Sequence, residues 1–308
     1  MWTYPAFALW RKTNRMPEGN EIYRYAELHR ETFVGKTICV ETPNGRFPDA
    51  ALLTGRKLKG VLTHGKHLGY DFGRDRKLHV HLGRFGDFTE GKMPFPEAKG
   101  ALRMRWSTRT DWLELRGAID CSVYTDQQWQ ALESRLGADP MAPNADPSPA
   151  FAYVQKAKQA IGALLMDQTV FAGIGNIYRA ELLYRAKQNP FTAGKDVAPK
   201  TKKLIWKDAV KLMPDGMVDR RIVTTRAKDR PHPTGQARRE ETHYVYRRHG
   251  KPCFVCGSTI LRTEMAGRTL YWCPTCQPDE TGAERAFLAK SKLRSKSALP
   301  NHLPRGAP

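Results

Sequence analysis

The chain has 308 residues, of which 40% are hydrophobic and 10% aromatic, and this composition excludes an intrinsically disordered protein. Lysine and arginine outnumber aspartate and glutamate by 51 to 31, which gives a formal net charge of +20. A field of this sign attracts polyanions, so nucleic acid is the predicted partner. No apolar stretch approaches the length of a membrane span, and we expect no membrane association.

The first fifteen residues lack the early positive charge, the sustained apolar core and the cleavage site of a secretory signal. We therefore expect a cytoplasmic protein, associated with the nucleoid through its charge.

The N-terminal half begins with a predicted helix over 19–30, where apolar residues recur at helical spacing. Short runs of β-type composition follow, separated by turn signals, at 36–42, 59–65, 66–72, 78–85 and 102–106. These runs indicate a β-sandwich or barrel. The stretch 139–150 is rich in Pro, Asp and Ala, and we place a domain boundary there.

Beyond this boundary the periodicity becomes helical, with predicted helices over 151–170, 176–188 and 200–213. The Gly-rich link 171–175 places Asn176 where a helix N-cap is expected. The amides at this helix start, with the Asn176 side chain, form either a phosphate site or only a capped helix pair. A basic loop is expected from Pro214 to Glu241.

Four cysteines form two tight pairs, Cys253 with Cys256 and Cys273 with Cys276. This spacing predicts one structural Zn²⁺ with four thiolate ligands, whereas a redox dithiol would need only one pair. The segment 258–272 would form a hairpin with Arg268 near its tip, either solvated or touching a phosphate. The two other cysteines, Cys39 and Cys121, are expected to be ordinary buried thiols.

Several separated motifs occur in one order along the chain: MPEGNEI at 16–22, GKHL at 65–68, HLGRFG at 81–86, the segment 164–183, and the paired cysteines with GR between them. In this set and order the chain resembles the formamidopyrimidine-DNA glycosylase and endonuclease VIII family of bifunctional DNA glycosylases. The glycine after Pro17 and Glu18 resembles the endonuclease VIII branch.

The resemblance implies an α+β fold: an N-terminal helix with a β-sandwich, a helical domain with a helix–two-turn–helix motif, and a C-terminal zinc-finger hairpin. The expected parts are a leader that the family lacks (1–16), a catalytic domain (17–145), a helical DNA-binding domain (150–243), the zinc finger (244–277) and a basic mobile tail (278–308). We expect the tail to contain a helical piece near 284–293 and to add nonspecific DNA affinity.

The resemblance further implies base-excision repair by a glycosylase and AP lyase, acting on oxidised bases, mainly pyrimidines, through a Schiff base and β,δ-elimination. The partner would be double-stranded DNA carrying oxidised bases or abasic sites, with the damaged nucleotide turned out of the stack. We expect a monomer.

The same resemblance assigns site residues one by one. Pro17 is the predicted nucleophile and Glu18 the acid, with Glu21 as a second carboxylate. Lys66 and Arg268 are predicted to hold phosphates and to assist the eliminations. The predicted DNA-binding residues are Asn176, Gln168, Arg84 and Phe85.

The loop carrying Arg84 departs from the family pattern, which presents an apolar residue at that position to fill the gap left by the extruded base. Phe85 is the expected wedge instead, and Arg84 would pair with the orphaned base or a phosphate. We expect His81 to be structural.

The chain start decides between two functions. If residues 1–16 are retained, the Pro17 nitrogen lies in an amide and cannot act as a nucleophile, so the chain would bind damaged DNA without cutting it. We expect these residues to be absent from the active protein. A zinc-ribbon RNA-binding protein would account for the charge and the cysteines, but not for PEG, GKHL and GIGN together.

Overall fold

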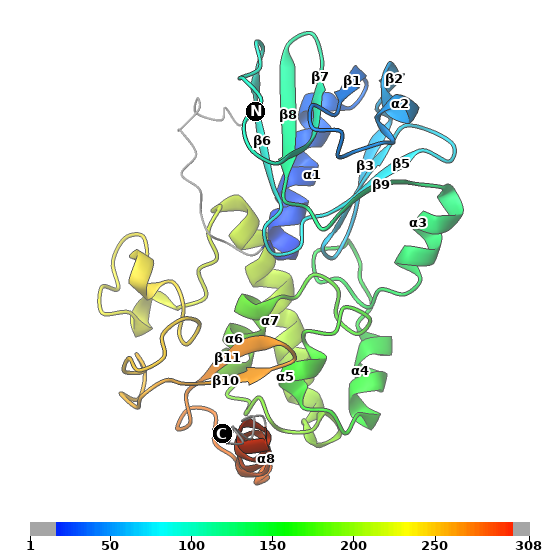
Figure 1. The fold of residues 1–308 in the computed structure, drawn as a ribbon. Coiled ribbons are helices and arrows are strands. Elements are labelled where there is room, and N and C mark those ends of the chain that lie inside the picture. Colours follow the sequence, from blue (N-terminus) through cyan, green and yellow to red (C-terminus); the bar gives the residue numbers. More distant parts are fainter. Residues whose placement is uncertain (1–16, 298–308) are drawn as a thin grey trace, which may run out of the picture.

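The computed structural model describes the backbone of residues 17–297 and the side chains of residues 17–290. The predicted leader 1–16 and the last residues, 298–308, lie outside the described residues. A β-sandwich occupies one end of the molecule and a set of helices the other, with a small hairpin in front of the helices (Figure 1). The predicted combination of sandwich, helical part and cysteine hairpin is confirmed.

Two antiparallel sheets form the sandwich. One has the order β2-β1-β7-β8-β6 and the other the order β3-β4-β5-β9. The strands are β1 (Thr37–Glu41), β2 (Arg56–Lys57), β3 (Gly60–His64), β4 (His67–Asp71), β5 (Lys77–His81), β6 (Asp87–Lys92), β7 (Leu102–Ser107), β8 (Asp111–Arg116) and β9 (Asp120–Tyr124). Two short helices, α2 (Ala50–Leu53) and α3 (Asp126–Glu133), flank them.

The N-terminal helix α1 (Gly19–Phe33) confirms the helix predicted over 19–30. Its buried side chains recur at helical spacing, so that Ile22, Tyr25 and Phe33 face the sandwich core beside Trp106. The strands contribute to this core through the side chains that alternate onto its face. In β1 the alternation buries Ile38 and Val40 and exposes Cys39, so the expected burial of that thiol is wrong, whereas Cys121 is buried.

The helical part consists of α4 (Ser148–Lys156), α5 (Ile161–Leu164), α6 (Asn176–Arg185) and α7 (Pro199–Val218). The single helix expected over 151–170 is broken, because the backbone at its centre pairs with another segment. The N–H of Ile161 donates to the carbonyl of Thr192 at 2.8 Å, and the N–H of Gly162 donates to that of Pro190 at 2.9 Å. Of the described helices, none combines the length and apolarity needed to cross a membrane.

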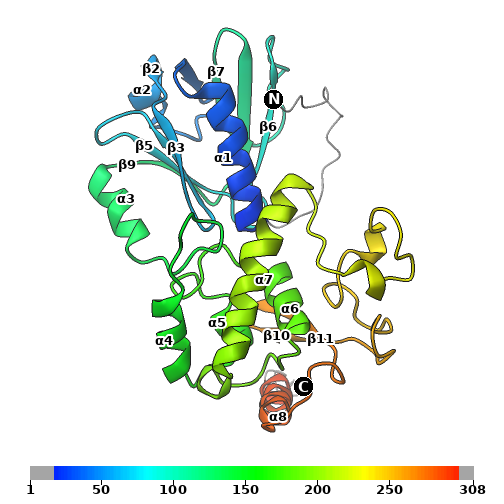
Figure 2. The same ribbon diagram turned by 180° about the vertical axis from the view of Figure 1, so that it is seen from behind.

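The basic loop begins later than expected, because α7 continues past Pro214 to Val218. Seen from behind, α7 runs along the helical part up to α1 (Figure 2). The segment directly after the loop is held by buried Glu181, whose carboxylate accepts the N–H groups of Tyr244, Val245 and Tyr246 at 2.7–2.9 Å. Short 3₁₀ turns lie at η1 (Gly194–Asp196), η2 (Ala227–Asp229) and η3 (Arg239–Glu241).

The C-terminal part consists of the hairpin β10 (Leu261–Met265) and β11 (Arg268–Trp272), followed by α8 (Ala283–Ser297). The helical piece expected near 284–293 is confirmed. At the start of this helix, Phe287 and Leu288 pack against the buried cluster that includes Trp272.

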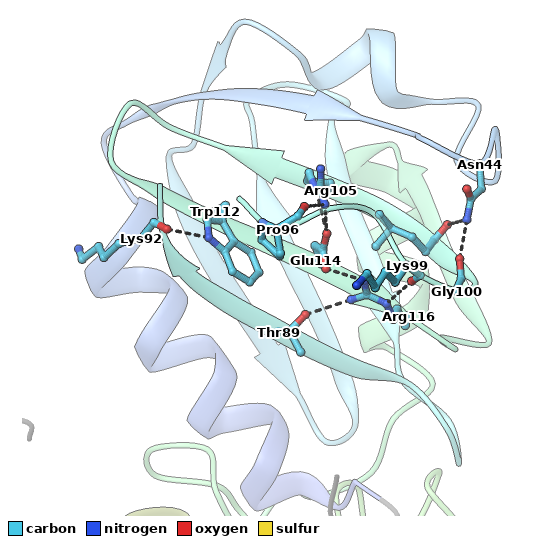
Figure 3. Close-up of polar contacts among 11 residues, drawn as sticks. Asn44, Thr89, Lys92, Pro96, Lys99, Gly100, Arg105, Trp112, Glu114 and Arg116 are labelled. Carbon is cyan, nitrogen blue, oxygen red and sulfur yellow. Dashed lines mark hydrogen bonds and ion pairs between the residues drawn. The ribbon is translucent and has the colours of Figure 1, made fainter. Parts of the chain in front are cut away.

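The face of the five-stranded sheet away from the core is covered by the segment between β6 and β7. On this face buried Arg105 pairs with buried Glu114, whose second oxygen lies 2.5 Å from Arg116 (Figure 3). Arg105 also donates to the carbonyl of Pro96 at 2.7 Å, so the ion pair ties the covering segment to the sheet.

Replacing Glu114 with alanine should lower the free energy of unfolding by about 3 kcal/mol, because it leaves the buried Arg105 cation without its partner. Urea unfolding measures this change. Glu97→Ala is the matched control on the covering segment: Glu97 is 84% exposed in its pair with Lys99, and its removal should change stability by less than about 0.5 kcal/mol. Equal losses in both variants would contradict the assignment.

Candidate active site

Three segments of the chain meet where the sandwich touches the helical part. They are the start of α1, the turn between β3 and β4, and the link that precedes α6. The N–H of Gly19 donates to the carbonyl of Gly173 at 2.9 Å. A side chain at Gly65 would place its Cβ 2.8 Å from the Gly173 nitrogen, and Gly173 itself has a φ of 84°. Glycine is needed at these positions because the three backbones approach one another so closely.

Glu18 lies at the centre of this junction and is 2% exposed. Its carboxylate accepts three backbone N–H groups at the start of α6, from Ile177 at 2.6 Å, Gly175 at 3.1 Å and Tyr178 at 3.2 Å. Burial raises the pKa of Glu18 above its ordinary value, although the charge of Lys66 and the three N–H groups oppose this shift.

This arrangement corrects two expectations. The N-cap of α6 is Gly175, not Asn176, which is the first residue of the helix. The amides expected to bind a phosphate instead donate to Glu18. This carboxylate is distant in the sequence but packs against the positive end of the helix.

Lys66 follows Gly65 and lies beside Glu18. Its Nζ donates to the carbonyl of Ile174 at 2.8 Å, and Gln168 donates to the same carbonyl at 3.0 Å. Burial lowers the pKa of Lys66 to about 8, and the charges of Arg268 and Arg179 act in the same direction, whereas Glu18 opposes them. Gln168 also accepts the N–H of Gly173 at 3.0 Å, so its side chain braces the turn.

Asn176 and Arg179 connect α6 to the hairpin. The Asn176 side chain donates to the carbonyl of Thr269 at 2.9 Å and accepts a hydrogen bond from Arg179. Arg179 is fully buried and donates to the carbonyl of Met265 at 3.0 Å. These bonds fix the hairpin tip, where exposed Arg268 interacts electrostatically with Lys66 and Arg179.

The site therefore brings together Glu18, Lys66, Asn176 and Arg268, which lie far apart in the sequence. Lys66 and Arg179 interact electrostatically with the Glu18 carboxylate, and Arg268 interacts with both of these cations. Such an excess of positive charge beside a buried acid suits a phosphate-bearing substrate.

The remaining predicted residues lie on two segments, the start of α1 and the turn between β5 and β6. Pro17 directly precedes Glu18 and is half-buried, and Glu21 pairs with Arg24 at 2.7 Å on the first turn of α1. Arg84 and Phe85 occupy the turn between β5 and β6, where the Phe85 ring is 72% exposed and the Arg84 guanidinium lies 5.3 Å from the ring centre.

Two residues of the junction were missed by sequence reasoning. Arg179 is one, and its only signal is its position three residues after Asn176 on the same helix. Asp139 is the other: it accepts the N–H of Gly65 at 2.7 Å and the hydroxyl of Tyr23 at 2.8 Å. It begins the Pro-rich stretch interpreted as a boundary, and nothing in its local sequence distinguishes it from a linker aspartate.

The four cysteines converge as the spacing predicts, with their sulfurs within 4.8 Å of one another. The Cys253–Cys276 and Cys256–Cys273 sulfur distances are 3.8 Å and 3.4 Å, close to the edge of about 3.8 Å of a tetrahedron with zinc–sulfur bonds of about 2.3 Å. The residues therefore fit a structural Zn²⁺ with no open coordination position. Tyr184 of α6 lies 3.1 Å from the Cys253 sulfur and joins this module to the helical part.

Comparison with known proteins matches three family models along the chain. They are the formamidopyrimidine-DNA glycosylase N-terminal domain at 16–119, the formamidopyrimidine-DNA glycosylase H2TH domain at 136–227, and the zinc finger found in FPG and IleRS at 250–278. Endonuclease 8 1 of Mycobacterium tuberculosis is 41% identical over 268 residues, covering 85% of this chain and 100% of the relative. The formamidopyrimidine-DNA glycosylase of Thermus thermophilus is 29% identical over 272 residues, covering 85% of this chain and 98% of the relative.

The fold is also that of a solved structure of the Lactococcus lactis Fpg in complex with DNA containing an abasic site. That structure has a TM-score of 0.71 and 22% identity, covering 85% of this chain and 100% of the other. The matched sandwich, H2TH and zinc-finger parts define a DNA glycosylase that is also an AP lyase of base-excision repair. The chain belongs to the formamidopyrimidine-DNA glycosylase and endonuclease VIII family.

Replacing Gly175 with alanine should lower the free energy of unfolding by about 1–3 kcal/mol, because the new Cβ would lie 2.4 Å from the Glu18 carboxyl carbon. The urea midpoint reports the change. Gly60→Ala is the control, since a Cβ there meets nothing within 4 Å, and it should shift stability by less than about 0.5 kcal/mol. A Gly175→Ala variant as stable as the control would show that the junction is looser than described.

Proposed function

We propose that this protein removes oxidised bases, mainly pyrimidines, from double-stranded DNA and cleaves the strand at the resulting abasic site. The observation that carries the proposal is the buried Glu18 carboxyl beside Lys66, directly after Pro17. In the form whose chain begins at Pro17, the nitrogen is a secondary amine. A terminal amine has a pKa of about 8, so an appreciable fraction is unprotonated at neutral pH.

In the proposed reaction, the Pro17 nitrogen attacks C1′ of the damaged nucleotide and the bond from C1′ to the base breaks. The nitrogen loses its proton, and the departing base takes one up. The C1′–O4′ bond of the sugar then breaks, O4′ takes up a proton, and the nitrogen lone pair completes an iminium with C1′. The iminium acidifies C2′, whose proton is lost as the 3′ phosphate departs, and elimination of the 5′ phosphate follows.

Glu18 is the proposed acid of these steps. Burial raises its pKa, so more of it is protonated at neutral pH than of an exposed glutamate, and a protonated carboxyl can transfer its proton to the sugar oxygen or the base. Its anchoring by α6 keeps it in place after the chain start has reacted. Glu21, on the first turn of α1, is the proposed second carboxylate of the site.

Lys66 and Arg268 are the proposed phosphate-binding cations, and their charges would stabilise each departing phosphate. Asn176 belongs to this clamp because its amide lies between Arg179 and the strand that carries Arg268. Gln168 supports the clamp through the turn it braces.

Phe85 is the proposed wedge that fills the gap left by the extruded nucleotide, with Arg84 directed to the orphaned base or a phosphate. The exposed ring of Phe85 supports this role. Preference for oxidised pyrimidines is supported by the higher identity to Endonuclease 8 1 than to the Thermus enzyme. A solved L. lactis Fpg complex with DNA containing an oxidised pyrimidine, at a TM-score of 0.72, has the same fold.

As part of the same proposal, the protein acts as a monomer in the cytoplasm, on the DNA of the nucleoid. Residues 1–16 are absent from the active form. Where they are retained, the chain binds damaged DNA and leaves it intact, because the amide nitrogen of Pro17 has no free lone pair.

The decisive experiment compares a form that begins at Met16, from which the initiator methionine is removed, with the full 308-residue form. Each is incubated with borohydride and a duplex carrying one thymine glycol. We expect a covalent protein–DNA adduct from the short form alone, because borohydride reduces the iminium. The full form, which should bind the same duplex without an adduct, is the matched control.

Two outcomes contradict the proposal. An adduct from the full form at equal yield would remove the requirement for a free Pro17 nitrogen. If neither form gave an adduct with any oxidised base or with an abasic site, the proposed enzyme mechanism would be wrong.

Binding should also weaken with rising pH because Lys66 loses its proton. With a pKa of about 8, its cationic fraction falls about tenfold between pH 7 and pH 9, and the affinity should fall by up to about the same factor. The measurement uses the full chain, in which Pro17 is not an amine, and a duplex with an uncleavable abasic-site analogue at constant ionic strength.

Lys66→Arg is the control for this dependence, because a guanidinium stays charged over the whole range. The affinity of this variant should change by less than about twofold between pH 7 and pH 9. Parallel pH curves for the two proteins would exclude Lys66 as the titrating group.

A further inference from the structure

Helix α8 lies beyond residue 278, where the zinc-finger family model ends, yet it is docked on the site's own scaffold. The Glu284 carboxylate accepts the indole N–H of Trp272 at 3.2 Å and the side-chain amide of Asn189 at 2.8 Å. One carboxylate thus bridges the zinc hairpin, through β11, and the segment that follows α6.

Apolar contacts hold the helix in the same position. The Phe287 ring lies 5.0 Å from the ring of Phe191, which in turn meets Trp272 edge-on at 5.0 Å. Leu288 and Ala283 pack against the same buried cluster. The direction of α8 is therefore fixed relative to the hairpin that carries Arg268.

The composition of α8 is strongly basic. Its only acidic residue is Glu284, which is already used in docking. Its five basic residues are Arg285, Lys290, Lys292, Arg294 and Lys296. Four of the five fall within the seven residues from 290 to 296. Docking uses the start of the helix, so its basic half extends away from the docked turn.

Helix α8 lies away from the junction that forms the candidate active site. In Figures 1 and 2 the helix is seen close to end-on below the hairpin, at the end of the molecule away from the sandwich. Its fifteen residues span about 22 Å, roughly the length of six base pairs. It is docked at Trp272, the last residue of β11, whereas Arg268 is the first residue of that strand, so α8 lies outside the clamp formed by Lys66, Asn176 and Arg268.

We propose that α8 is a rigid basic arm that binds the phosphate backbone of duplex DNA flanking the lesion. This inference rests on the proposed function, because the clamp must hold the lesion for the flanking duplex to reach the arm. The docked start of α8 fixes the direction of its basic half, so little ordering entropy is lost when DNA binds. The contacts would be with phosphates and independent of sequence.

The test uses the full 308-residue chain with Lys290, Lys292, Arg294 and Lys296 all replaced by glutamine. The matched control replaces four exposed lysines of α7, Lys200, Lys203, Lys207 and Lys211, so that the net charge changes equally. Affinity is measured on duplexes of about 12 and about 36 base pairs, each with a central uncleavable abasic-site analogue, over a range of salt concentrations.

On the long duplex we expect the α8 variant to lose about tenfold in affinity and its salt slope to fall by about 2, because two or more phosphate contacts are lost. The short duplex offers about six base pairs on either side of the lesion, which the proposal takes to be too few to reach the arm, so there the α8 variant should match the control variant. An equal loss on both duplexes, or a loss no larger than that of the control, would overturn the proposal.

A second variant, Phe287→Ala, keeps the charge but removes a docking contact. It should lose affinity for the long duplex and retain it for the short one, whereas wild-type affinity on both would show that no rigid arm exists. The analogue cannot be cleaved, so failure of the borohydride experiment would leave this binding result interpretable on its own.

Discussion

The hydrogen bonds from the start of α6 to the Glu18 carboxylate are the interaction on which the arrangement of this protein depends. They join the first residues of the sandwich part to the first turn of a helix in the other part. Because Glu18 follows Pro17 directly, the same bonds fix the position of the proposed nucleophile. The positive end of α6 stabilises the carboxylate and satisfies amides that would otherwise be left without partners.

Close backbone approach makes this junction possible and also sets its electrostatics. Glycines at 19, 65, 173 and 175 let the segments meet, and the resulting burial shifts two ionisable groups in opposite senses. It raises the pKa of Glu18 and lowers that of Lys66 to about 8. Both groups are thereby moved towards neutral pH, where a proton can be given or taken at small cost.

A series of contacts connects α6 to the zinc hairpin. Asn176 and Arg179 hold the tip, Tyr184 reaches the cysteine cluster, and Glu284 of α8 holds the base of β11. The metal cross-links the module internally, while these contacts orient it towards the junction. In this way one short helix aligns the acid, the clamp and the hairpin, which supports both proposals made for this protein.

The sequence by itself determined the features that depend on local pattern: the helix after Pro17, the alternating strands and the four-thiolate zinc module, whose spacing is a local geometric property. The ordered motifs also identified the family and brought Glu18, Lys66, Asn176 and Arg268 forward as candidates. Only the tertiary structure decided which partner each group took. The amides of α6 bind a carboxylate 159 residues away from Ile177, Cys39 faces outwards, the buried Arg179 holds the hairpin, and α8 is docked. Spacing shows that a helix end or a side chain can form a bond, but competition among distant partners is settled only when the chain is packed.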